Sequence, residues 1–278
     1  MSSSTKISSD SLDALGNHGE RMVPEYSDGR TFWEHVYRYA FACRLVRGKK
    51  VLDVACGEGY GSAALQRAGA SSVIGVDINE GVCLHARVKY QLDVRVGSAE
   101  SLPVSDRSVD VVVSFETIEH VPNPSRFLEE CARVLIPGGK LVVSTPNKNI
   151  YSGPGRASNP HHCSEMTEGE FVAALRSQFR SVRIYTQRPM TAAVWSPRIF
   201  AAEAIPPVRG IGRLRRSARF RLFPRAVCDP TASDRTSAVD LILSASRSGD
   251  NMLNPHAVRP KKSWHRETPM YLIAVATG

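Results

Sequence analysis

The chain has 278 residues, of which 42% are hydrophobic and 23% charged, a balance typical of a globular protein and not of a disordered or fibrous one. No apolar run approaches the roughly 18 residues that a membrane helix needs. Residues 1–18 are rich in serine and aspartate and lack the apolar segment of a secretory signal, so we expect a disordered tail and a cytoplasmic protein. The six cysteines have no C-x-x-C spacing, which argues against a disulfide framework and a zinc site.

The net charge of +9 is concentrated in one segment, residues 207–225, which contains seven arginines and no acid. These are Arg209, Arg213, Arg215, Arg216, Arg219, Arg221 and Arg225. Such a run could contact an anionic membrane surface and make the protein peripheral to the membrane. It could also track nucleic-acid phosphates, or remain a solvated basic loop.

The N-terminal part of the chain predicts a helix over residues 32–45, with Trp33, Tyr37 and Phe41 along one face. We interpret residues 19–48 as a helical lid. From Lys49 onward, short apolar runs alternate with helical segments, which predicts a sheet with helices on both faces in a domain of residues 49–278. The expected strands are 51–54, 72–76, 94–96, 109–114, 141–144, 181–185 and 271–276. The expected helices are 60–68, 81–90, 125–135 and 167–178.

Two segments of this domain have little periodicity. Residues 145–164 are rich in Pro, Gly, Asn and His, and a loop of this length in a compact domain is usually functional or disordered. Residues 188–269 are expected to be an insertion that contains the arginine run and a strand at 239–244.

The strongest local signal is VLDVACGEGYG at residues 51–61, a strand that leads through a glycine-rich turn into a helix. Gly57, Gly59 and Gly61 allow a sharp turn and close approach of a ligand to the helix N-terminus. Asp77 ends the next strand, where a carboxylate can bind both hydroxyls of a ribose. Asp77 could instead cap the following helix, and Asp53 could either brace the turn or contact a ligand directly.

Five blocks stand in order over residues 49–147: VLDVACGEGYG, VIGVDIN, GSAESLP, VDVVVSFETIEHVPNP and RVLIPGGKLVVSTPN. With them the chain resembles the class I S-adenosylmethionine-dependent methyltransferases, in particular the small-molecule group related to the ubiquinone-biosynthesis methyltransferases. The segments GERMVPE and HVYRYAFA also resemble methyltransferases that modify glycans. The resemblance implies an α/β fold, a Rossmann-like seven-stranded doubly wound sheet with an antiparallel final strand, and S-adenosyl-L-methionine as cofactor.

The resemblance also assigns cofactor contacts. It implies that the three glycines flank the methionine part, that Asp77 binds the ribose, and that Ile78 lies against the adenine. Ser98, Ala99 and Glu100 would surround the adenine amino group, although Ser98 replaces the acid usual in the family. Glu116 would hold the methionine ammonium or a polar group of the substrate. Arg21 and Tyr37 are expected to reach the methionine carboxylate from the lid.

The candidate catalytic residues follow the fourth strand and the N-P-x-H-like loop. His120 is the natural general base because imidazole titrates near physiological pH, although it could merely line the pocket. Glu119 is an alternative base or a solvated acid at a helix start. His162 matches the family's loop histidine and is expected to touch substrate, whereas His161 departs from the usual aromatic. We expect no metal site, since His161 and His162 are too close for a zinc motif and no carboxylate cluster supports one.

We therefore expect methyl transfer to oxygen or nitrogen of a small-molecule or glycan- or lipid-linked acceptor. A nucleic-acid (RNA) methyltransferase that uses the arginine run is the lesser alternative, because residues 115–118 read FETI where base methyltransferases have an Asn-Pro-Pro-Tyr type motif. An NAD-dependent oxidoreductase is disfavoured because Gly61 falls one residue early for the dinucleotide fingerprint. A binding protein without catalytic activity is the remaining alternative.

Overall fold

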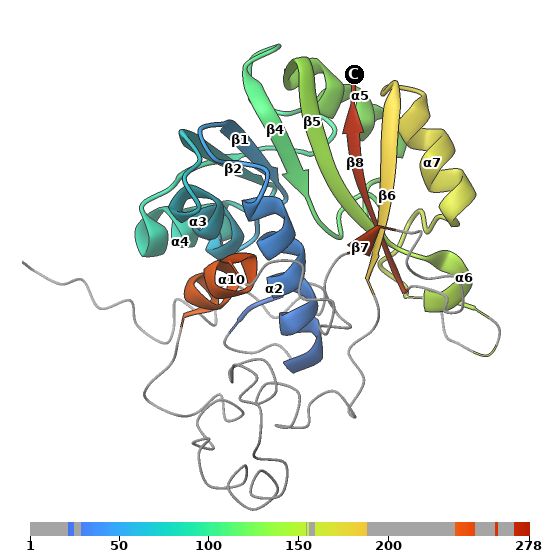
Figure 1. Ribbon diagram of the computed structural model, residues 1–278, viewed down its shortest axis with the longest axis horizontal. Coiled ribbons are helices and arrows are strands. Elements are labelled where there is room, and N and C mark those ends of the chain that lie inside the picture. The colour runs from blue at the N-terminus through green and yellow to red at the C-terminus, as the bar shows by residue number, and fades with distance from the viewer. Residues whose placement is uncertain are drawn as a thin grey trace, which may run out of the picture.

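A computed structural model describes residues 22–24, 29–153, 155, 159–187, 237–247, 259–260 and 270–278. These residues form one sheet covered by helices (Figure 1). The sheet order is β3-β2-β1-β4-β5-β8-β6-β7. The strands are β1 (Lys50–Val54), β2 (Ser72–Asp77), β3 (Asp93–Val96), β4 (Val109–Ser114), β5 (Leu135–Pro146), β6 (Ser181–Gln187), β7 (Arg259–Pro260) and β8 (Tyr271–Thr277).

The first five strands are parallel, and the last long strand runs the other way. β1 pairs in parallel with β2 and β4, as β2 does with β3 and β4 with β5. β8 lies between β5 and β6 and is antiparallel to both. The expected seven-stranded sheet with an antiparallel final strand is confirmed; the two-residue β7 adds a short eighth strand beside β6.

Helices cover both faces of this sheet. They are α2 (Gly29–Cys43), α3 (Tyr60–Arg67), α4 (Glu80–Tyr90), α5 (Pro124–Val134), α6 (Lys148–Tyr151), α7 (Glu168–Arg176) and α10 (Ala238–Arg247). Alternate strand residues enter two separate apolar clusters because successive side chains point to opposite faces. Val111 and Val113 pack with α2, α3 and α10, whereas Val112 packs with α5 and α7.

The expected strand at 239–244 is wrong, because these residues belong to helix α10. Val239, Ile242 and Leu243 are buried at helical spacing, and Ser237 accepts a hydrogen bond from the Asp240 backbone N–H at 3.2 Å. α10 packs beside α2 and α3, although about two hundred residues separate it from α2 in the chain (Figure 1). The segment expected to be an insertion therefore contributes to the core.

Other expectations concern the loops and termini. Thr167 and Glu170 form the capping box that begins α7. The expected long loop at 145–164 is shorter, since β5 runs to Pro146 and α6 follows it. Residues 1–21 and the arginine run at 209–225 lie outside the described residues. Within the described part of the chain, no helix has the length and apolar character needed to cross a bilayer.

Candidate functional site

The glycine-rich turn connects the carboxyl end of β1 to α3. Gly57 and Gly59 adopt positive φ angles of 54° and 85°, which glycine reaches without steric cost. A Cβ on Gly59 would also lie 2.8 Å from the Cβ of Ala86 on α4. A Cβ on Gly61 would overlap the ring of Tyr39 from α2. The turn is therefore closely packed between α4 on one side and α2 on the other.

Asp77, at the end of β2, is hydrogen-bonded to this turn. Its Oδ2 accepts from the backbone N–H of Gly57 at 3.0 Å, and its Oδ1 accepts from the N–H of Asn79 at 3.0 Å. The alternative that Asp77 caps the next helix is wrong, because the side chain of Asn79 accepts from the N–H of Val82 and caps α4. Ile78 is 75% exposed, an unusual position for an isoleucine beside a buried carboxylate.

Asp53, beneath the turn, acts as a brace. Its fully buried carboxylate accepts hydrogen bonds from the Ser62 hydroxyl at 2.6 Å and from the Tyr39 hydroxyl at 3.2 Å. Burial raises the pKa of Asp53 to about 7, and the nearby charge of Asp77 acts in the same direction. Asp53 thus connects β1, α3 and α2, in agreement with the bracing interpretation.

The loop after β3 contains the three residues expected near an adenine. Ser98 accepts a hydrogen bond from the backbone N–H of Glu100 at 3.1 Å, and Ala99 packs on the apolar cluster below α5. The Glu100 carboxylate accepts from the N–H of Asn123 at 2.6 Å, just before α5 begins. Ser98, which stands in place of an acid, therefore stabilises the conformation of this loop. Glu100 connects the loop to the residue before α5.

A buried charged network beneath α2 was missed by the sequence analysis. Arg38 is fully buried, donates to Gln187 Oε1 at 2.9 Å, and lies 3.8 Å from Glu116 Oε1. Its guanidinium also stacks 4.7 Å above the ring of Tyr271. Burial opposes the charge, but Glu116, Tyr271 and Glu34 together raise the pKa of Arg38. The Nε of Arg38 has no hydrogen-bond partner.

The aromatic face of α2 is not its most deeply buried side. Trp33, Tyr37 and Phe41 are only half-buried, whereas Arg38 is inside. Tyr37, expected near the cofactor, has its ring 6.2 Å from the ring of Trp33. Arg21, which was also expected to reach the methionine carboxylate, lies outside the described residues. The sequence contains one signal for an ion pair at Arg38, since Glu34 and Arg38 lie four residues apart on a helix. Such pairs are usually exposed to solvent, so the spacing does not indicate that Arg38 is buried.

Glu116 has a strained backbone, with a φ of 52°. Its N–H donates to Ser144 Oγ at 3.1 Å, and that hydroxyl donates to Glu116 Oε1 at 2.6 Å. Non-glycine residues in this conformation are uncommon and often mark functional sites. Ser144 of β5 thus holds the Glu116 carboxylate toward Arg38.

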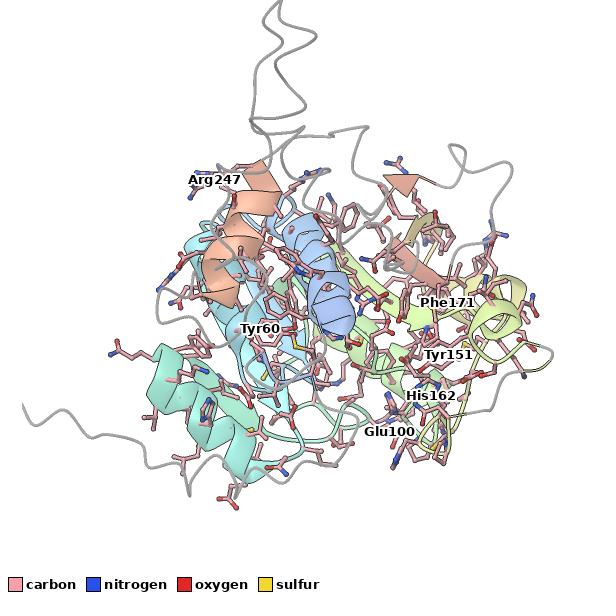
Figure 2. The ribbon with its side chains drawn as sticks, turned by 90° about the horizontal axis from the view of Figure 1, so that it is seen from below. Tyr60, Glu100, Tyr151, His162, Phe171 and Arg247 are labelled. Atoms are coloured by element: carbon pink, nitrogen blue, oxygen red, sulfur yellow. The ribbon has the colours of Figure 1, made fainter. Side chains whose placement is uncertain are left out.

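Glu119 and the two histidines expected to be catalytic come together beyond β4 and α6. Donor atoms of Glu119, His120 and His162 all lie within 4.8 Å of one another. The rings of His120 and His162 meet edge to face at 4.8 Å, and the ring of Tyr151 lies 5.1 Å from that of His162. Figure 2 shows Tyr151 and His162 side by side. One carboxylate thus lies beside the two histidines, an arrangement that the expectation of no metal site did not include.

Glu119 is not the solvated acid considered above. It is fully buried, and neither carboxylate oxygen has a hydrogen-bond partner of good geometry; the hydroxyl of Thr145 beside it is also unpaired. Burial and the charge of Glu116 raise the pKa of Glu119 well above its usual range. Burial therefore favours the uncharged form of the Glu119 carboxyl group.

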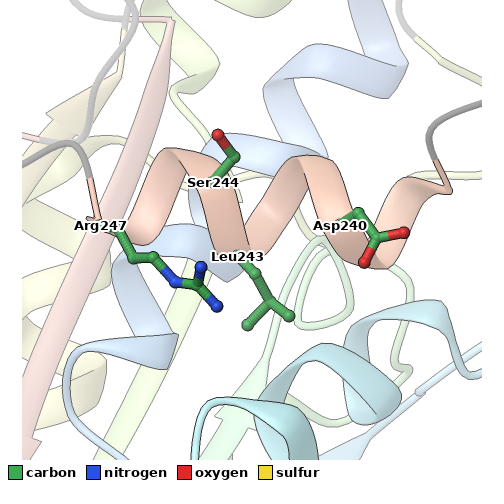
Figure 3. Close-up of a pocket in the computed structure, with 4 residues that line it drawn as sticks. All are labelled: Asp240, Leu243, Ser244 and Arg247. Atoms are coloured by element: carbon green, nitrogen blue, oxygen red, sulfur yellow. The ribbon is translucent and has the colours of Figure 1, made fainter.

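A separate surface hollow of about 390 Å³ lies on α10 (Figure 3). It is lined by Asp240, Leu243, Ser244 and Arg247, all from this one helix. None of the expected site residues lines this hollow. They gather instead at the carboxyl edge of the sheet, which is therefore the candidate site.

Comparisons with known proteins agree with this geometry. Residues 52–143 match the family model described as a methyltransferase domain. A probable S-adenosylmethionine-dependent methyltransferase of Mycolicibacterium smegmatis is 40% identical over 169 residues, 59% of this chain and 65% of that protein. The ubiquinone biosynthesis O-methyltransferase of Idiomarina loihiensis is 42% identical over 38% of this chain and 45% of its own length. Residues 52–143 are thus a methyltransferase domain, similar to those of S-adenosylmethionine-dependent enzymes.

A solved structure shares the fold of this chain. An S-adenosylmethionine-dependent methyltransferase from Thermotoga maritima superposes with a TM-score of 0.54 at 18% identity, covering 89% of this chain and 92% of that one. The chain spans less than two thirds of the length of the curated relatives named above. The match to the family model extends from β1 into β5 and includes Asp53, Asp77 and Glu116. Arg38 and His162 lie outside it, in segments that the methyltransferase family model does not describe.

Proposed function

We propose that the protein transfers a methyl group from S-adenosyl-L-methionine to oxygen or nitrogen of a small-molecule or glycan- or lipid-linked acceptor. The observation that carries this proposal is the position of Asp77. Its carboxylate ends β2 and is hydrogen-bonded to Gly57 of the glycine turn. A carboxylate at this point suits the two hydroxyls of a ribose laid across the strand ends.

The rest of the site fits the other parts of the cofactor. The exposed Ile78 side chain offers an apolar surface for adenine, with Ser98, Ala99 and Glu100 beyond it. Gly57, where a Cβ would meet nothing within 4 Å, leaves room for the amino-acid end, whereas Gly59 and Gly61 let the turn pack closely on α4 and α2. The buried Arg38 has an unpaired Nε that suits a carboxylate, and Glu116 beside it suits an ammonium group. When bound, the cofactor supplies an electrophilic methyl group on a sulfonium.

The residues of the chain position the acceptor and remove its proton. His120 and His162 are the candidate bases. Glu119 is a weaker candidate than expected, because burial disfavours the charged form that could accept a proton. Tyr151 and the two histidine rings form one wall of the acceptor site. Holding the acceptor atom in line with the methyl group and the sulfur accounts for much of the rate enhancement, because orientation lowers the barrier.

The location of the enzyme is proposed from the positive charge of the arginine run. Arg209–Arg225 could bring a cytoplasmic enzyme to an anionic membrane surface, where each basic residue contributes about 1 kcal/mol. This would suit a lipid-linked acceptor. A nucleic-acid substrate remains the less favoured alternative.

Calorimetric titration with S-adenosylmethionine, S-adenosylhomocysteine and NADH tests the proposal. We expect binding of the two adenosyl sulfur compounds and none of NADH. Transfer of tritium from methyl-labelled cofactor to a panel that includes 3,4-dihydroxybenzoate and methyl α-D-glucopyranoside then tests the acceptor class. Binding of NADH alone would overturn the assignment.

A further inference from the structure

His162 lies at the centre of a hydrogen-bonded cluster on the loop between α6 and α7. Its side chain is 5% exposed, and its Nδ1 lies 2.6 Å from Oε1 of Glu165, whose side chain is 9% exposed. The same carboxylate oxygen accepts a hydrogen bond from the Ser152 hydroxyl at 2.8 Å. Glu165 was not among the residues expected from the sequence.

The hydrogen bonds determine which nitrogen of His162 carries the proton. Asn159 Oδ1 accepts from the backbone N–H of His161 at 3.0 Å, which fixes the orientation of the Asn159 amide. The amide nitrogen of Asn159 therefore faces His162 Nε2 at 3.1 Å, and this nitrogen can only donate. Nε2 must then be the acceptor, so Nδ1 carries the proton and donates to Glu165.

The loop that carries these residues is attached on both sides. The backbone N–H groups of Cys163 and Ser164 donate to the carbonyl of Glu119 at 2.8 and 3.0 Å. The Lys148 N–H donates to the carbonyl of Met166 at 3.0 Å. Glu165 lies between these two attachments, so the backbone holds its carboxylate against the imidazole.

We propose that Glu165 is a positioning residue that holds His162 in the tautomer of a general base, with the Nε2 lone pair directed to the methyl acceptor. The proposal rests on the proposed function and deepens it. In the structure the Asn159 amide occupies the place that an acceptor hydroxyl or amine takes when it donates to Nε2. Glu165 also places a carboxylate beside the imidazolium that forms on proton transfer, the arrangement used by many histidine bases.

The step balances with the groups named. An acceptor hydroxyl gives its proton to His162 Nε2 while its oxygen forms a bond to the methyl carbon. The carbon–sulfur bond of the cofactor breaks, and its electron pair stays on sulfur as a neutral thioether. The imidazolium later releases the proton to water. No oxidant, reductant or further reactant is needed.

His120 differs from His162 in its partners. Its Nδ1 lies 3.1 Å from the backbone carbonyl of His161, and its Nε2 lies 4.0 Å from the Glu119 carboxylate. A neutral backbone carbonyl thus faces Nδ1 of His120, whereas a carboxylate faces Nδ1 of His162. His120 packs edge-on against the His162 ring and lines the site from the β4 side.

The first experiment reads the tautomer directly and needs no acceptor. Full-length protein labelled with ¹⁵N-histidine and saturated with S-adenosylhomocysteine is studied by long-range ¹H–¹⁵N correlation NMR. We expect His162, assigned by its absence in His162→Asn, to carry its proton on Nδ1. Because the Asn159 amide also favours this tautomer, both Glu165 variants are made together with Asn159→Ala. Glu165→Leu should then give a mixture of tautomers or the opposite one, whereas Glu165→Gln, which keeps an acceptor oxygen, should retain the original. A proton on Nε2 in the wild-type protein would overturn the proposal.

The second experiment measures turnover of the acceptor found in the panel above. We expect kcat to fall about 10- to 100-fold in Glu165→Leu, and less in Glu165→Gln, with KM for the cofactor unchanged. Glu168→Gln, three residues along the chain, is the matched control and should behave like the wild type. Equal kcat in all four proteins would overturn the proposal.

Two further outcomes separate this proposal from others. Loss of turnover with a chelator and its return with Mg²⁺ or Zn²⁺, together with shifted His162 resonances, would make His162 a metal ligand and overturn its role as a base. Failure of S-adenosylhomocysteine to bind any variant or the wild type would instead contradict the proposed function.

Discussion

The ring of Tyr39 on α2 occupies the space that a side chain at Gly61 would fill, so α2 packs directly on the start of α3. The Tyr39 hydroxyl donates to Asp53 at 3.2 Å, and its ring lies 5.1 Å from the ring of Phe115 at the end of β4. One aromatic residue thus connects α2 to the ends of both β1 and β4, beside the glycine turn. The sequence shows the glycine but not the reason for it.

Gly61→Ala should destabilise the protein because the new methyl group overlaps the Tyr39 ring. Overpacking of this kind costs about 1–3 kcal/mol, which chemical denaturation with urea measures. Gly169→Ala is the control, since a Cβ there meets nothing within 4 Å and alanine favours the helix. If Gly61→Ala and Gly169→Ala unfold at the same urea concentration, the packing described here is wrong.

Asp77→Ala should weaken binding of S-adenosylhomocysteine, because two ribose hydroxyls and the N–H of Gly57 lose their partner. An unpaired buried polar group costs about 1–3 kcal/mol, so we expect about 5- to 150-fold weaker binding by calorimetry. Asp93→Asn, an exposed residue of β3 paired with Arg95, should leave the affinity unchanged. Unchanged affinity in Asp77→Ala would remove the main support for the cofactor site.

The sheet could be predicted from the sequence because its strands are buried on both faces and read as continuous apolar runs. The site residues that follow strands, such as Asp77, could be predicted for the same reason, since parallel strands end at one edge. Arg38 could not, because its burial depends on Tyr271 and Gln187, which lie far along the chain. The α10 helix was misread because a short apolar run fits a strand as well as a helix until its packing partner α2 is known.

The pH dependence of stability should reveal the buried Asp53. Its pKa is about 7 in the folded protein, against 3.8 for the ordinary side chain, so the folded state binds this proton more tightly than the unfolded state does. The contribution is therefore favourable below about pH 4, is lost as the pH rises from about 4 to 7, and is absent above that. Asp53→Asn removes this dependence.

The measurement compares the free energy of unfolding of Asp53→Asn and wild type between pH 4 and 8. We expect the wild type to lose stability relative to the variant by up to roughly 4 kcal/mol over this interval, with no further change above pH 7. Using the difference cancels the effect of Glu119, which shifts in the same direction in both proteins. A difference that is constant with pH would show that Asp53 is ionised throughout.

His120→Ala should lower turnover of the acceptor found in the panel while leaving cofactor binding intact, because the His120 ring lines the acceptor side and packs on His162. If His120 only supports the His162 ring, the loss in kcat should be about tenfold; if it is itself the base, the loss should reach about 10²- to 10⁴-fold. His161→Asn is the control, because the His161 side chain is exposed and only its backbone takes part in the cluster. Turnover in His120→Ala equal to that of His161→Asn would place His120 outside the acceptor site.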